Sequence, residues 1–126
     1  MNVVIVDDSE LVRDRIQKRI SELDEINVSG VASNSIEAQE IIKSSNPDVV
    51  ILDIKMPGES GIELLTKIKE YYPHIKVIML TNYPFLQYRS KCYENGADYF
   101  LDKSNEFEKV TEILTDITKL VSSKSN

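Results

Sequence analysis

The chain has 126 residues, which is enough for one domain with a hydrophobic core. Its composition, 41% hydrophobic and 29% charged, is that of an ordinary soluble globular domain. The net charge of −6 and the lack of a basic patch argue against direct binding to nucleic acid.

Cysteine usage and hydropathy indicate the compartment. The only cysteine, Cys92, allows no intrachain disulfide, which suits a reducing cytoplasm, and we interpret it as a packing residue rather than a reactive thiol. No apolar run approaches the ~18 residues that a membrane-spanning helix needs. No leader precedes the strand-like run that starts at residue 2. We therefore expect a cytoplasmic protein without membrane attachment.

Strand-like and helix-like segments alternate along the chain. Nearly continuous apolar runs predict buried strands, and apolar residues at helical spacing predict the helices between them. In chain order these are a strand at Val3–Val6, a helix after the N-cap candidate Ser9, a strand at Val28–Ala32, a helix through Ile36–Ile42, a strand at Val49–Leu52, a helix through Ile62–Ile68, a strand at Lys76–Leu80, a helix with Pro84 in its first turn, a strand at Ala97–Leu101 and a helix capped by Ser104.

This alternation predicts an α/β fold of the flavodoxin-like kind. We expect a doubly wound, five-stranded parallel sheet in the order 2-1-3-4-5, with five helices on its two faces. The first and third strands are then neighbours at the switch point, and ligands bind beyond their carboxyl ends. We predict one domain over residues 1–121 and a polar C-terminal tail over residues 122–126.

Carboxylates end two of the predicted strands. Asp7 and Asp8 follow the first strand, and Asp53 follows the third. Three carboxylates in one partly desolvated pocket repel each other strongly. A hard cation with oxygen ligands relieves this repulsion, and Mg²⁺ is the first candidate. The alternative is that Asp7 and Asp8 only cap the helix that follows them.

Two further polar residues follow the fourth and fifth predicted strands. Thr81 brings a hydroxyl and Lys103 brings an ammonium to the same edge of the sheet. A carboxylate can attack phosphorus and form an acyl phosphate, while a cation, a hydroxyl and an ammonium bind the phosphoryl oxygens. The alternatives are that Thr81 caps the fourth helix and that Lys103 is a solvated surface lysine.

Four segments, at the predicted strand ends and in the same order, resemble the receiver domain of two-component response regulators. They are Val6-Asp7-Asp8-Ser9, Leu52–Gly58 with Gly61, Leu80-Thr81-Asn82 and Gly96–Lys103.

The resemblance covers essentially the whole chain and implies a role for each acidic residue. Asp53 would be the phosphoacceptor. Mg²⁺ would be bound by Asp7, Asp8, Asp53 and the main-chain carbonyl of Lys55.

The resemblance also implies roles for the other residues at this edge. Thr81 and Lys103 would contact the phosphoryl group, and Phe100 occupies the aromatic switch position that works together with Thr81. The family often has Tyr at this switch position, so here a switch must act through packing. The family also often has Lys-Pro with a cis peptide bond where this chain has Lys103-Ser104. A cis bond without proline costs about 2.5–4 kcal/mol, so none is assumed.

The function implied is that of a stand-alone, chemotaxis-regulator-like response regulator. A sensor histidine kinase or a phosphotransfer protein would phosphorylate Asp53, and the receiver would catalyse only its own phosphorylation and dephosphorylation. Output would pass to a partner protein through the face of the fourth helix, fifth strand and fifth helix. We expect a monomer or a weak dimer.

Two alternatives stay open. An aspartate-nucleophile phosphatase also uses a strand-end aspartate and Mg²⁺, but it typically has a second acid where this chain has Lys55. The second alternative is that the chain is the N-terminal receiver of a longer DNA-binding regulator, with Ser122–Asn126 as the start of a linker.

The sequence suggests a docking surface for the kinase. Ser9, Leu11, Val12 and Arg15 lie in the first turns after the acid pair, where helical spacing gives Leu11 and Arg15 a common face. The alternative is that Leu11 and Val12 are both core residues.

Two residues are expected to tune the lifetime of the phosphoryl group. Lys55 lies two residues after Asp53, and Tyr83 lies two residues after Thr81. Both side chains should cover the mouth of the pocket and exclude the in-line water that hydrolysis needs. The alternative is that Lys55 stabilises charge in the transition state and speeds loss of the phosphoryl group.

Overall fold

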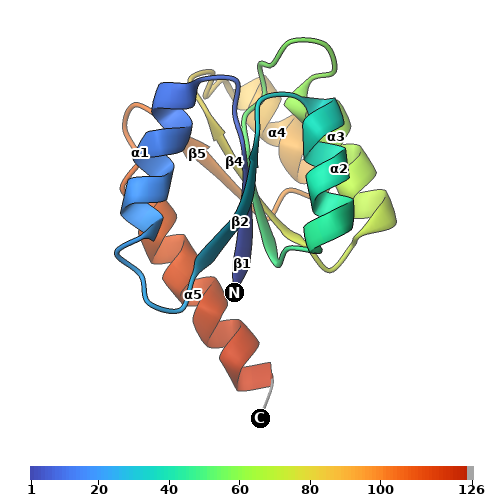
Figure 1. Cartoon of the computed structure of the whole chain (residues 1–126). Coiled ribbons are helices and arrows are strands. Elements are labelled where there is room, and N and C mark those ends of the chain that lie inside the picture. The colour runs from blue at the N-terminus through green and yellow to red at the C-terminus, as the bar shows by residue number, and fades with distance from the viewer. Residues whose placement is uncertain (125–126) are drawn as a thin grey trace.

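The computed structural model describes residues 1–124, in which five strands alternate with five helices (Figure 1). The elements are β1 (Asn2–Val6), α1 (Glu10–Ile20), β2 (Asn27–Ala32), α2 (Ser35–Ser45), β3 (Val49–Leu52), α3 (Gly61–Tyr71), β4 (Lys76–Thr81), α4 (Leu86–Glu94), β5 (Tyr99–Asp102) and α5 (Lys109–Lys124).

The strands form one parallel sheet in the order β2-β1-β3-β4-β5, so the predicted fold and strand order are confirmed. The register places Val6 opposite Leu52 in the β1–β3 pair. In the β4–β5 pair, Thr81 is opposite Asp102. These pairings bring the carboxyl ends of β1, β3, β4 and β5 to one edge, where the polar residues of the sequence analysis follow.

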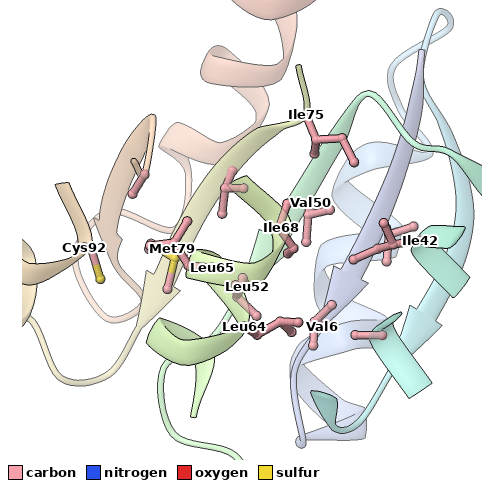
Figure 2. Close-up of a cluster of buried hydrophobic side chains, with 14 of the residues drawn as sticks. Val6, Ile42, Val50, Leu52, Leu64, Leu65, Ile68, Ile75, Met79 and Cys92 are labelled. Carbon is pink, nitrogen blue, oxygen red and sulfur yellow. The ribbon is translucent and has the colours of Figure 1, made fainter. Parts of the chain in front are cut away.

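The sheet is buried on both faces, which explains the nearly continuous apolar runs of its strands. Alternate strand residues face two separate clusters. One cluster lies under α2, α3 and α4 and includes Val6, Leu52, Met79 and Cys92 (Figure 2). The other lies under α1 and α5 on the opposite face.

Three helices begin with the side-chain caps that their sequences favour. Ser9, Asn34 and Ser60 each accept a hydrogen bond from a backbone N–H in the first turn of α1, α2 and α3. Helix α4 differs, because its N-cap Phe85 makes no side-chain hydrogen bond and only Cys92 of its residues is buried. Helix α4 therefore has fewer capping and packing interactions than α1, α2 and α3.

The β5–α5 region differs from the prediction. Strand β5 starts at Tyr99 and extends to Asp102, and the prediction that Ser104 caps α5 is wrong, because α5 begins only at Lys109. The Ser104 N–H donates to the Asp102 carboxylate at 2.9 Å, and the intervening residues form turns. No cis peptide bond occurs in the part of the chain that the structure describes.

The C-terminal boundary also differs in detail. Helix α5 continues to Lys124, past the predicted domain end at residue 121, and the last residues of the predicted tail, 125 and 126, lie outside the described residues. None of the described helices is both long and apolar enough to cross a membrane.

Cys92 is fully buried, as predicted, and burial raises the pKa of its thiol to about 11. Because the thiolate is the reactive form, we expect iodoacetamide to alkylate the native protein at neutral pH on the order of 100-fold more slowly than the urea-unfolded chain. Mass spectrometry of timed samples measures both rates. Equal rates in the two states would contradict the burial of this thiol.

Candidate functional site

Three carboxylates meet at the carboxyl edge of the sheet. Asp7 follows β1 and Asp53 follows β3, and both are buried, whereas Asp8 is exposed. One oxygen from each of the three carboxylates lies within 4.8 Å of the other two. The sequence prediction that these three acids share a pocket is therefore confirmed by the geometry.

Main-chain hydrogen bonds fix the two buried acids. The Asp53 N–H donates to the Val6 carbonyl at 3.0 Å, and the Asp53 Oδ1 atom accepts from the Ile54 N–H at 2.8 Å. The Asp7 Oδ1 atom accepts from the Ser9 N–H at 2.9 Å. Each carboxylate thus has one oxygen held by the backbone and a second oxygen available for another partner.

Lys103 supplies that partner for both acids. Its Nζ atom lies 2.6 Å from Asp7 Oδ2 and 3.0 Å from Asp53 Oδ2, and the side chain is only 8% exposed. The Lys103 N–H donates to the Thr81 carbonyl at 2.8 Å, which continues the β4–β5 ladder. A buried lysine with two carboxylate partners is not the solvated surface lysine of the alternative reading.

Burial and charge act against each other in this pocket. Burial raises the pKa of Asp53, and the neighbouring Asp7 raises it further, although the attraction of Lys103 lowers it. Burial alone would lower the pKa of Lys103, but the hydrogen bond to Asp7 and the charges of both carboxylates outweigh it and raise this pKa. Lys103 is therefore an ammonium at neutral pH, shared between two acids.

The set of donor atoms fits Mg²⁺. One ammonium does not balance three carboxylates, and carboxylate oxygens are the ligands that this ion prefers. One oxygen of each carboxylate lies within 4.8 Å of the other two, so the three acids are near enough to one another to share a single ion. Lys55, whose carbonyl is the expected fourth ligand, is in the loop directly after Asp53.

Gly61 brings α3 into contact with the backbone of the acid site. Its N–H donates to the Ile54 carbonyl at 2.8 Å. A Cβ atom at Gly61 would lie only 1.8 Å from the carbonyl oxygen of Asp53, which no side chain tolerates. Glycine is therefore required here by a close approach of two backbone segments.

The two expected switch residues lie on neighbouring strands and on the same face of the sheet, because Phe100 pairs with Met79 and Thr81 is two residues after Met79. Thr81 is fully buried, and its Oγ1 atom accepts from the Tyr83 N–H at 3.0 Å, so it closes a short turn and does not cap α4. Phe100 is buried in the cluster under α4, together with Cys92 and with Tyr88 at the margin.

Lys55 and Tyr83 contact each other. The Lys55 ammonium lies 5.3 Å from the centre of the Tyr83 ring and 5.7 Å from that of Tyr88. Phe85 lies between these two rings, 6.4 Å from Tyr83 and 5.9 Å from Tyr88. The sequence analysis did not predict this cluster of Lys55, Tyr83, Phe85 and Tyr88. It joins the loop after β3 to the loop before α4 and to α4 itself, and sequence patterns do not define the conformations of these loops.

The four residues expected to dock a kinase have different surroundings. Leu11 is 80% exposed, so it is not a core residue. Ser9 caps α1, Val12 packs against the cluster under α1 and α5, and the Arg15 guanidinium lies 3.9 Å above the Phe107 ring. Leu11 is thus an apolar member of this set with most of its side chain free for a partner.

One contact near the acids was missed from the sequence. The Arg13 guanidinium donates to the main-chain carbonyl of Asp7 at 2.6 Å and so fixes the turn between β1 and α1. Arg13 follows Val12, which belongs to the apolar stripe of its helix. Nothing in this pattern distinguished Arg13 from a solvated arginine.

The chain belongs to the response regulator receiver domain family, whose sequence profile matches residues 3–115. It is 33% identical over 115 residues to the chemotaxis protein CheY of Halobacterium salinarum, a match that covers 91% of this chain and 94% of CheY. It is also 33% identical over 116 residues to the transcriptional regulatory protein MalR of Bacillus subtilis, covering 92% of this chain and 49% of MalR. The chain thus spans about half the length of the curated transcriptional regulators that it matches.

Solved structures of response regulators are also similar to this chain. The isolated receiver domain of RcsB from Salmonella enterica serovar Typhimurium, determined with the phosphomimetic BeF₃⁻, has a TM-score of 0.89 at 26% identity, covering 94% of this chain and 88% of that one. CheY in the CheX–CheY–BeF₃–Mg²⁺ complex of Borrelia burgdorferi has a TM-score of 0.79 at 29% identity, covering 90% and 89%.

We expect Gly61→Ala to destabilise the protein by about 2–4 kcal/mol, because a backbone clash at Asp53 forces α3 to move. Urea unfolding followed by circular dichroism measures this change. Gly58→Ala is the control: Gly58 has a φ of +79° but nothing within 4 Å of an added Cβ, so only a backbone strain of about 1 kcal/mol applies. An equal loss in both variants would contradict the clash at Asp53.

Proposed function

We propose that the protein is a phosphorylation-activated response regulator that accepts a phosphoryl group on Asp53 from a sensor histidine kinase or a phosphotransfer protein. The observation that carries this proposal is the position of Asp53 at the sheet edge, next to Asp7 and Asp8, with Lys103 bonded to its Oδ2 atom at 3.0 Å. A carboxylate oxygen of Asp53 attacks phosphorus as the P–N bond of the phosphohistidine breaks, and the bonding electron pair leaves with the imidazole nitrogen.

Each neighbouring residue has a part in this transfer. Asp7, Asp8 and Asp53, with the main-chain carbonyl of Lys55, would hold Mg²⁺. The ion supplies positive charge to the phosphoryl oxygens and so offsets the repulsion between them and the acids. Lys103 donates to one phosphoryl oxygen and Thr81 donates its hydroxyl to another. The Mg²⁺ and BeF₃ named together with CheY in the Borrelia burgdorferi complex support this assignment.

Output is proposed to begin at Thr81. When its hydroxyl binds the new phosphoryl oxygen, it gives up its hydrogen bond with the Tyr83 N–H, and Phe100 repacks against α4. The differential interaction of Thr81 with the phosphorylated and free states supplies the shift. A partner protein then binds the face of α4, β5 and α5, and we propose no direct contact with DNA by this domain.

Phosphatase activity on an outside substrate is the second candidate, and we do not favour it. Lys55 stands where such enzymes typically have an acid, and its ammonium faces the rings of Tyr83 and Tyr88. We propose catalysis only of the protein's own phosphorylation and dephosphorylation, in a monomer or weak dimer. The cytoplasmic location expected from the sequence stays part of this proposal.

Acetyl phosphate with Mg²⁺ is expected to add one phosphate to the protein, because the site itself catalyses the transfer. Intact-mass spectrometry measures the product, and omission of Mg²⁺ or the Asp53→Asn substitution should abolish it. Asp48→Asn is the matched control, since Asp48 lies at the opposite end of β3, where it accepts from the Asn2 N–H. An Asp53→Asn protein that still gains the phosphate would refute the assignment of the phosphoacceptor.

Kinase docking is proposed on the exposed surface of α1 around Leu11, with Ser9, Val12 and Arg15 as its neighbours. We expect Leu11→Asp to reduce transfer from the kinase by about tenfold or more, since a charge replaces an apolar contact, and to leave labelling by acetyl phosphate unchanged. Rates with both donors decide this. Ile36→Asp on α2 is the control, because Ile36 is 72% exposed against 80% for Leu11. Equal losses with both donors would contradict a docking role.

The lifetime of the phosphoryl group is proposed to depend on the contact between Lys55 and Tyr83, which covers the route of the hydrolytic water. We expect Lys55→Asn combined with Tyr83→Ala to speed dephosphorylation about threefold or more, because the in-line position opens. Loss of the phosphate mass after removal of the donor measures the rate. Tyr93→Ala, at an exposed tyrosine in the last turn of α4, is the control. A slower or unchanged rate in the double variant would overturn the shielding argument.

A further inference from the structure

The connection between β5 and α5 has to hold Lys103 accurately, because a long side chain reaches two buried carboxylates from a loop. The Lys103 backbone makes only one ladder bond, to Thr81 at 2.8 Å, and residues 103–108 then form turns. Ser104 follows, where proline would have fixed φ near −65° and would have removed an N–H donor. The loop therefore needs another means of fixing its conformation.

The side chain of Asp102 provides part of it. Its Oδ1 atom accepts from the Ser104 N–H at 2.9 Å, and its Oδ2 atom accepts from the Asn105 side-chain amide at 2.9 Å. Its main-chain carbonyl accepts from the Glu106 N–H at 2.8 Å. Asp102 thus binds the three residues that follow Lys103, and one of these bonds uses the Ser104 N–H, which a proline would lack.

Glu106 closes the arrangement from the other end. Its Oε1 atom accepts from the Asp102 N–H at 3.1 Å, which lies on the open side of the edge strand β5, and its Oε2 atom accepts from Lys109 Nζ at 3.0 Å. The hydrogen bond to Lys109 and the one to Asp102 lower the pKa of Glu106, so it is a carboxylate at neutral pH. Asp102 and Glu106 exchange main-chain and side-chain bonds across Lys103, and we call this arrangement the Asp102–Glu106 bracket.

We propose that the Asp102–Glu106 bracket positions Lys103 for phosphoryl transfer, in place of a proline at position 104. The side chains of Asp102 and Glu106 bond to Ser104, Asn105, Lys109 and the Asp102 N–H. In this proposal they act only through Lys103, so they are positioning residues and not catalytic ones. The role of the bracket in phosphoryl transfer rests on the proposed function, but its effect on the position of Lys103 can be tested without phosphate.

The first test measures the Lys103 ammonium in the free protein by ¹⁵N-resolved nuclear magnetic resonance. A buried ammonium bonded to two carboxylates exchanges its protons slowly and gives a signal. We expect Glu106→Ala to raise its exchange rate about tenfold or to abolish the signal, because the loop opens locally. Glu106→Gln, whose carbonyl oxygen can still accept from the Asp102 N–H, should retain the signal.

Glu108→Ala is the matched control. Glu108 lies in the same loop, is exposed and pairs with Arg19 on α1, so its removal deletes the same charge without touching the bracket. Loss of the ammonium signal in Glu108→Ala, or its retention in Glu106→Ala, would overturn the proposal. If Glu106→Ala does not fold, Asn105→Ala removes one exposed hydrogen bond of the bracket and should give a smaller change in the same direction.

The second test is a double-mutant cycle on the rate of phosphorylation by acetyl phosphate. We expect Glu106→Ala to slow the reaction about fivefold when Lys103 is present and to have no further effect in a Lys103→Met background. An equal loss in both backgrounds would mean that the bracket does not act through Lys103. A parent protein that takes up no phosphate would count against the proposed function, while the ammonium signal still decides the position of the lysine.

Discussion

The ammonium of Lys103, held between the buried carboxylates of Asp7 and Asp53, is the interaction on which the site depends. Two acids at adjacent strand ends repel each other at short range, and desolvation strengthens that repulsion. The cation of Lys103, directly after β5, attracts both carboxylates and so lets them lie close together. The sheet order makes this possible, since β1 and β3 are neighbours and only β4 lies between β3 and β5.

The same interaction couples folding to chemistry. Loss of one partner of a buried ion pair is strongly destabilising, because it leaves an uncompensated charge. The fold therefore keeps the Asp53 carboxylate next to a cation. Gly61 also helps to fix Asp53, because it lets α3 contact the Asp53 backbone without a side chain between them.

The fold and the acid site were predictable because both depend on local patterns. Runs such as Val49–Leu52 are apolar throughout because both sheet faces are covered, and parallel strands bring their carboxyl ends to one edge. The start of α5 was predicted wrongly at Ser104. The Ser104 N–H bonds to the Asp102 carboxylate and the Asp102 N–H bonds to Glu106, so these residues form a turn where a capped helix was expected. The contact of Lys55 with Tyr83 and Tyr88 joins the loop after β3 to the loop before α4 and to α4 itself, and no periodic pattern indicates such a pairing.

Helix α4 has one buried residue, no side-chain cap and an exposed first turn that includes Leu86. Its separation from the sheet would remove little apolar contact, so the free energy of that local opening is well below that of global unfolding. In the proposed output route, a change of about one hydrogen bond at the sheet edge, on the order of 1 kcal/mol, would therefore give a several-fold change in the population of α4 positions.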